Sequence, residues 1–128
     1  MARMTPEQLK ARLAKAAKRV IEDTHTGMQK AALNIEARAK LNCTPGSSPY
    51  PDAPFDKGLL RAEIYHAVEI HGNAVQGFII SPTEYAEPVH EGSSRKYARP
   101  FLLDAIVSER DATQKFLAED IAAGLEAA

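Results

Sequence analysis

Residues 5–42 read TPEQLKARLAKAAKRVIEDTHTGMQKAALNIEARAKLN and contain one helix start followed by a single helix-breaking residue, Gly27. Thr5 suits the N-cap, Pro6 the first helical position and Gln8 the third position of a capping box. Apolar residues then recur at helical spacing and keep their phase across Gly27. These residues are Leu9, Leu13, Ala16, Val20, Met28, Ala31, Ile35 and Ala39. The stretch therefore predicts one helix from about residue 5 to 42.

The length of this helix sets the first expectation about assembly. At about 1.5 Å per residue it would extend over roughly 55 Å, which is longer than a domain of this size is wide. Its apolar stripe is rich in alanine, so it buries little area per residue. We therefore expect something outside the small core to cover part of the helix.

The next segment, residues 43–58, holds four of the eight prolines and is predicted to be a loop. Two β-prone runs, 65–70 and 75–80, then flank a Gly-Asn turn and predict a hairpin within a sheet region of about 62–82. Alternation along the first run places Val68 and Ile70 on the inward face.

The remaining chain is predicted to be a loop over 83–98 and a helix over about 99–124, with Pro100 in its first turn. Residues 1–128 are thus predicted to be a single α+β domain. It consists of a long N-terminal helix, a small antiparallel sheet with a hairpin, and a C-terminal helix.

Charge and composition narrow the classes of partner. Lys and Arg number 16 and Asp and Glu 17, so the formal net charge is −1, and nucleic-acid binding would need a local basic patch. The single cysteine, Cys43, allows no intrachain disulfide and suits a reducing compartment. No run approaches the roughly 20 apolar residues of a membrane span, and the N-terminus lacks the apolar core of a signal peptide. We expect a protein made and used in the cytoplasm, with no membrane partner.

Residues with catalytic or metal-binding potential do not form a known pattern. His90-Glu91 resembles the start of the zinc motif HExxH, but position 94 is serine, so the second histidine is missing. Cys43 lies at the end of a helix, where the dipole raises a thiol pKa. The serines lack a Gly-x-Ser-x-Gly elbow. We expect no catalytic residue, no metal and no cofactor, and hence no enzyme.

A local basic cluster lies just before the last helix. Arg95, Lys96 and Arg99 surround Tyr97, whose ring could stack on a base. Neighbouring carboxylates offset the charge of this cluster. They are Glu84, Glu87 and Glu91. The cluster could therefore contact DNA or form ion pairs with another subunit.

Three segments, in order, resemble elements of the tail-completion proteins (head-tail joining or neck proteins) of long-tailed bacteriophages and prophages. Residues 85–92, YAEPVHEG, resemble the family's YAxxVExG element, and residues 98–102, ARPFL, match its ARPFLxPA element. Residues 53–64, APFDKGLLRAEI, stand in the place of its APxDTGxLRxSI element. The chain departs from the pattern at Lys57, at His90 and at Asp104, where the family has threonine, an acidic residue and proline.

The resemblance implies a non-enzymatic virion subunit, assembled in the host cytoplasm, that forms a ring, commonly a hexamer. This ring caps the tail tube and docks the head connector. The residues assigned to assembly are Asp56, Gly58, Leu59, Tyr85, Glu91, Gly92, Arg99, Pro100, Phe101 and Leu102. Arg95 and Lys96 remain candidates for either a DNA or a subunit contact. The alternatives are another neck component, such as a head-closure subunit, and a small nucleic-acid-binding protein.

Within this hypothesis the C-terminal helix has a defined attachment. We expect Arg99 and a nearby carboxylate such as Glu91 to hold the turn before the helix. Phe101 and Leu102 are expected to anchor the helix to the sheet.

Overall fold

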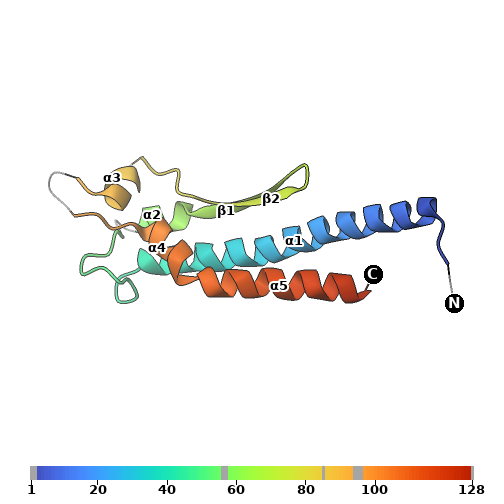
Figure 1. Ribbon diagram of the computed structural model, residues 1–128. Helices are drawn as coiled ribbons and strands as arrows, with labels where there is room; N and C mark the ends of the chain where they lie inside the picture. Colours follow the sequence, from blue (N-terminus) through green and yellow to red (C-terminus); the bar gives the residue numbers. More distant parts are fainter. Residues whose placement is uncertain (1–2, 56–57, 85, 94–96, 128) are drawn as a thin grey trace.

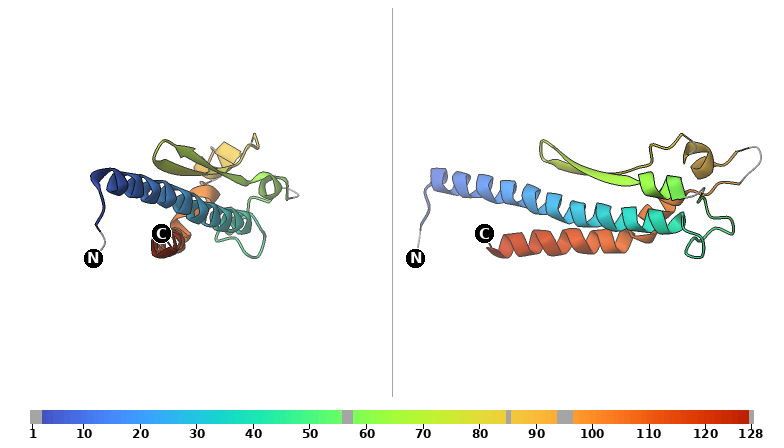
Figure 2. Two further views of the ribbon diagram at one scale, coloured as in Figure 1. Left: turned by 90° about the vertical axis from the view of Figure 1, so that its right-hand side faces the viewer. Right: turned by 180° about the vertical axis from the view of Figure 1, so that it is seen from behind.

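The computed structural model describes residues 3–55, 58–84, 86–93 and 97–127. Helix α1, Pro6–Asn42, runs along the molecule, with α5, Arg110–Ala127, against one side of it. A hairpin of β1, Tyr65–His71, and β2, Ala74–Ile80, lies on the other side (Figures 1 and 2). The predicted α+β fold, with its long N-terminal helix, two-stranded antiparallel sheet and C-terminal helical part, is confirmed.

Helix α1 begins with the predicted capping box. The Gln8 backbone N–H donates to Thr5 Oγ1 at 3.1 Å, and the Thr5 N–H donates to Gln8 Oε1 at 3.0 Å. Gly27 does not break the helix, and α5 packs closely against it. A Cβ at Gly27 would lie 3.2 Å from the Leu117 Cα, and one at Gly124 would overlap the Asp23 carboxylate. Glycine therefore allows the two helix backbones to meet.

The hairpin is fully paired, from Tyr65 opposite Ile80 to His71 opposite Ala74. Its strands begin later than the predicted sheet region because residues 59–63 form a short helix, α2, Leu59–Glu63. The expectation that Ile70 faces inward is wrong, since this side chain is 48% exposed. A sheet of two strands covers only part of α1, so the end of the hairpin near its turn stays in solvent.

The segment after the hairpin contains more helix than predicted. Helix α3, Ala86–Glu91, forms within the predicted loop 83–98, and Gly92 with φ 90° ends it. The predicted helix 99–124 is divided into α4, Phe101–Ser108, and α5, with Glu109 between them. This break turns the chain so that α5 runs back along α1 (Figure 1).

Glu109 holds the joint between α4 and α5 against α1. Its carboxylate accepts hydrogen bonds from Arg38 Nε at 2.9 Å and Asn34 Nδ2 at 2.8 Å. The hydrogen bond from Arg38 is the main cause that holds the Glu109 pKa below its usual value, against the opposing effect of burial. The ionised carboxylate is therefore favoured in the folded state.

We predict that this carboxylate makes the fold acid-sensitive. Because the folded-state pKa lies below the ordinary value of 4.5, the contribution is complete above pH 4.5 and is lost as the pH falls through the folded value. Glu109→Gln should lower the free energy of unfolding by about 1 kcal/mol at neutral pH. Urea denaturation from pH 7 to pH 3 should show a smaller loss of stability for Glu109→Gln than for the natural chain. Glu119→Gln, on the exposed face of α5, is the control, and identical pH profiles for Glu109→Gln and the natural chain would contradict the prediction.

The hydrophobic core lies around the C-terminal part of α1. Its largest fully buried side chains are Phe101, Leu60, Ile64 and Cys43. Small residues complete it, namely Ala39, Ala86 and Ala105. Phe101 thus anchors α4 mainly onto helices, and the expectation that it packs on the sheet is wrong except for a contribution from Ile79. The N-terminal part of α1 has no share in this core.

Candidate assembly site

The three segments that carry the resemblance meet in this core. They come from α2, α3 and α4, which cluster at the end of the molecule opposite the N-terminus (Figure 1). The contributing side chains are Leu60, Ile64, Ala86, Val89, Phe101, Leu102 and Ala105. Many residues of these three segments therefore serve packing of the core.

Leu59 was assigned to the assembly site, but its neighbour Leu60 makes the buried contact. Leu59 is 48% exposed and Leu60 is 0% exposed. Gly58 precedes them in the left-handed conformation, φ 81°, and caps α2. Leu60 and Ile64 are four residues apart and share one face of this turn, so helical spacing would have selected Leu60.

Arg99 holds the turn before α4 with a different partner from the one expected. Its guanidinium donates to the Asp52 carbonyl oxygen at 2.9 Å and lies 3.6 Å from the Asp52 carboxylate. The expectation that Glu91 serves as this partner is wrong, and Glu91 is exposed at the end of α3. Arg99 is only 8% exposed, so it ties α4 to the Pro-rich loop and does not present a charge to DNA.

The other assigned residues fall into two groups. Pro100 occupies the N-cap position just before α4, without a side-chain hydrogen bond, and Leu102 packs against the core beside the buried Phe101. Four assigned residues lie outside the described residues. They are Asp56, Tyr85, Arg95 and Lys96.

Polar contacts fasten the Pro-rich loop and α1 to α4. Asn42 Nδ2 donates to the Phe101 carbonyl oxygen at 3.1 Å, and the Tyr50 hydroxyl donates to the Asp104 carboxylate. Burial raises the pKa of the Cys43 thiol to about 12, although Arg99 and Arg61 oppose the shift. The pKa of Cys43 is raised as expected, but the cause is burial of the thiol, whereas the expectation rested on the helix end. Cys43 thus remains a protonated, buried thiol.

His90 lies beside a cavity of about 230 Å³ between α3 and α4, lined in part by Ser81, Glu87 and Leu102. Its ring meets Phe101 edge-on with centroids 5.7 Å apart, and Nε2 accepts the Leu103 backbone N–H at 3.2 Å. This acceptor role requires the neutral ring with its proton on Nδ1. His90 therefore serves the packing of α3 on α4.

Within the part of the chain that the structure describes, no group of three or more His, Cys, Asp or Glu is arranged to hold a metal ion. No described helix is long and apolar enough to cross a membrane.

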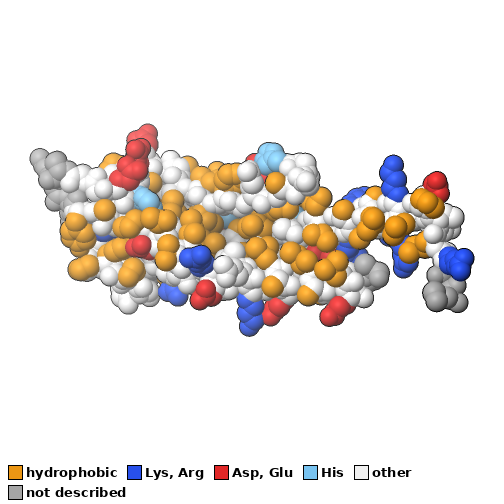
Figure 3. Space-filling view, in the orientation of Figure 1, with side chains coloured by type: hydrophobic (Ala, Val, Ile, Leu, Met, Phe, Trp, Pro, Cys, Tyr) orange, Lys and Arg blue, Asp and Glu red, His pale blue; other side chains and the backbone are white. Residues whose placement is uncertain are grey.

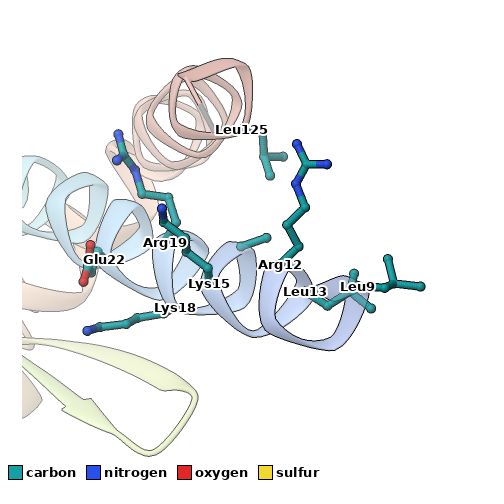
Figure 4. Close-up of a pocket in the computed structure, with 9 residues that line it drawn as sticks. Leu9, Arg12, Leu13, Lys15, Lys18, Arg19, Glu22 and Leu125 are labelled. Carbon is teal, nitrogen blue, oxygen red and sulfur yellow. The ribbon is translucent and has the colours of Figure 1, made fainter. Parts of the chain in front are cut away.

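The first part of α1 projects beyond the end of α5 (Figures 1 and 2). Leu9 and Leu13 on this part are 46% and 62% exposed, and Leu125 at the end of α5 is 53% exposed. Together they line a groove of about 780 Å³ (Figure 4). Four cations and one carboxylate, Glu22, also line it, and we call the whole the basic groove. These cations are Arg12, Lys15, Lys18 and Arg19.

Charge is unevenly distributed along the chain. Residues 3–19 carry six Lys and Arg and one acidic residue, Glu7, whereas residues 20–128 carry ten Lys and Arg and sixteen Asp and Glu. Arg19 pairs with Asp23 at 3.4 Å. Among the described residues, no carboxylate lies within 4.0 Å of a charged nitrogen of Lys15 or Lys18. Figure 3 shows Lys and Arg beside hydrophobic side chains on the projecting part of α1.

The molecule has a larger solvent-accessible surface than a compact monomer of the same mass. Its accessible surface is 8676 Å². A compact monomer of 13.9 kDa is expected to have about 6,700 Å². The excess of roughly 2,000 Å² is comparable to two partner-facing patches of about 800 Å² each. An elongated chain of this kind has enough uncovered area for two neighbours.

Comparison with known proteins gives no relative for this arrangement. No family model matches the chain, and neither a curated protein nor a solved structure matches it significantly.

Proposed function

We propose that this protein is a non-enzymatic assembly subunit that completes the tail of a long-tailed phage or prophage. In this role it forms a ring, caps the tail tube and docks the head connector. The observation that carries the proposal is the large uncovered surface of a chain whose core is confined to one end. The ordered resemblance over 53–64, 85–92 and 98–105 supports the more specific assignment to the phage neck.

The side chains with catalytic potential support a structural role. Cys43 is buried with a raised pKa, and a protonated thiol is a poor nucleophile. His90 uses Nε2 to accept a backbone N–H and its ring to pack on Phe101. Both residues therefore stabilise the core that holds the assembly surfaces in place.

Incorporation into particles tests the proposed role. The tagged chain, expressed with the tail-tube and head-connector proteins of the same phage or prophage, should copurify with tails and appear in electron micrographs as a ring at their head-proximal end. Tails made without the chain should fail to join heads. Tails that join heads normally without it, and particles that never contain it, would contradict the proposal.

A further inference from the structure

We propose that the basic groove of one copy docks on an acidic, apolar face around α4 of the next copy, head to tail. The proposal rests on the ring assembly proposed above and adds the two surfaces that meet. It follows from the chemistry of two exposed patches at opposite ends of the molecule.

The first patch is the basic groove. Its centre is apolar, because Leu9, Leu13 and Leu125 are about half exposed or more. Its rim is cationic, and Lys15 and Lys18 are exposed on α1. Arg12 points across the groove towards Leu125 (Figure 4). An apolar centre with a charged rim is the arrangement of a protein–protein interface.

The second patch is the outer face of α4. Leu103, Ile106 and Val107 are 53%, 46% and 63% exposed and follow helical spacing, so they form one stripe. Glu91 and Asp111 are both exposed. Glu91 follows His90, which accepts the Leu103 backbone N–H, and Asp111 lies three residues after the end of α4. We call these five residues the acidic face. Figure 3 shows hydrophobic side chains gathered over this end of the molecule.

The charges of the two regions are opposite. The basic groove is lined by four cations against one carboxylate, whereas the acidic face carries two exposed carboxylates. Complementary charge favours docking between different patches over docking of either patch on itself. Each copy then offers one basic groove and one acidic face, which is a heterologous interface and closes into a ring when the rotation per subunit allows it.

The apolar centre of the groove favours a protein over the two other anionic partners. A DNA duplex would neutralise Lys15 and Lys18 but would leave Leu9 and Leu13 without an apolar partner. A lipid surface prefers a wider apolar stripe of large side chains, and the stripe continues from Leu13 with alanine at position 16. The acidic face supplies both carboxylates and leucine-sized contacts.

Charge reversal on the full chain tests the interface. Lys15→Glu/Lys18→Glu and Glu91→Lys/Asp111→Lys should each weaken self-association at least about tenfold in sedimentation velocity. Self-association of the natural chain should also weaken as salt rises from about 50 to 500 mM. Glu69→Lys reverses one charge on the exposed part of the hairpin, away from both patches, and should associate like the natural chain.

Mixing the two double variants separates loss of contact from loss of fold. Each variant alone should stay monomeric with an unchanged circular dichroism spectrum. The equimolar mixture should assemble again, because every groove then finds a face of opposite charge.

Several results would overturn the inference. A natural chain that remains monomeric at high concentration would do so, although the tail-completion role, tested on particles, could still hold. Unchanged assembly of Lys15→Glu/Lys18→Glu, or no recovery on mixing, would also overturn it. A groove variant that loses binding to a short DNA duplex, or to phosphatidylserine-containing vesicles, while self-association persists would assign the groove to nucleic acid or lipid instead.

Discussion

Phe101→Ala is expected to lower the free energy of unfolding by about 3–5 kcal/mol, because it removes the largest side chain of the core and leaves a cavity. Phe101 is 0% exposed and belongs to a buried cluster that also contains Leu60, Ile64 and Cys43. Three alanines complete this cluster and have no flexible side chain with which to fill the space.

Urea denaturation of the dilute chain measures this loss without a contribution from assembly. Phe78→Ala is the matched control, since Phe78 is 40% exposed on the hairpin. We expect its effect to be less than half that of Phe101→Ala. A change below about 0.5 kcal/mol for Phe101→Ala would place the ring outside the core.

Leu60→Ala is expected to lower the free energy of unfolding by about 2–5 kcal/mol. Leu60 is the buried residue through which α2 packs into the core. The same substitution at Leu59 changes the adjacent position of the same five-residue helix, where the side chain is 48% exposed. Leu59→Ala should stay within about 0.5 kcal/mol of the natural chain.

The two leucines make a direct comparison, because local helix propensity changes equally in both variants. Denaturation midpoints of both should be read at one concentration. Equal losses at the two positions would mean that both side chains are buried. A larger loss at Leu59 would reverse the assignment of the buried face of α2.

The parts of the fold that depend on residues close together in the sequence were predictable. The capping box of Thr5 and Gln8 starts α1 as expected, and a Gly-Asn turn joins the two strands. The predicted last helix was continuous because helical spacing persists beyond Phe101. The break at Glu109 was not predictable, because this carboxylate is held by Arg38, which is 71 residues away in the sequence.

The candidate site, too, was predictable only where its structure depends on neighbouring residues. Burial of Phe101 follows from its place in the first turn of an amphipathic helix. The left-handed conformation of Gly58 is typical of a glycine in a turn, here the turn that precedes α2. The choice between Glu91 and Asp52 as the partner of Arg99 depended on where the Pro-rich loop folds. Asp52 is 47 residues from Arg99 in the sequence, and no spacing rule joins them.

The sequence by itself determined that residues 5–42 form one helix too long for a small core, because capping and helical period act over a few residues. Tertiary structure alone decided which part of that helix is covered. Helix α5 turns at Glu109 and packs beside Gly27, with Lys30 paired to Asp120 across 90 residues of sequence. The end of α5 lines the basic groove with Leu9 and Leu13 but leaves both leucines exposed. Burial depends on contacts between distant segments, whereas helix formation depends on near neighbours.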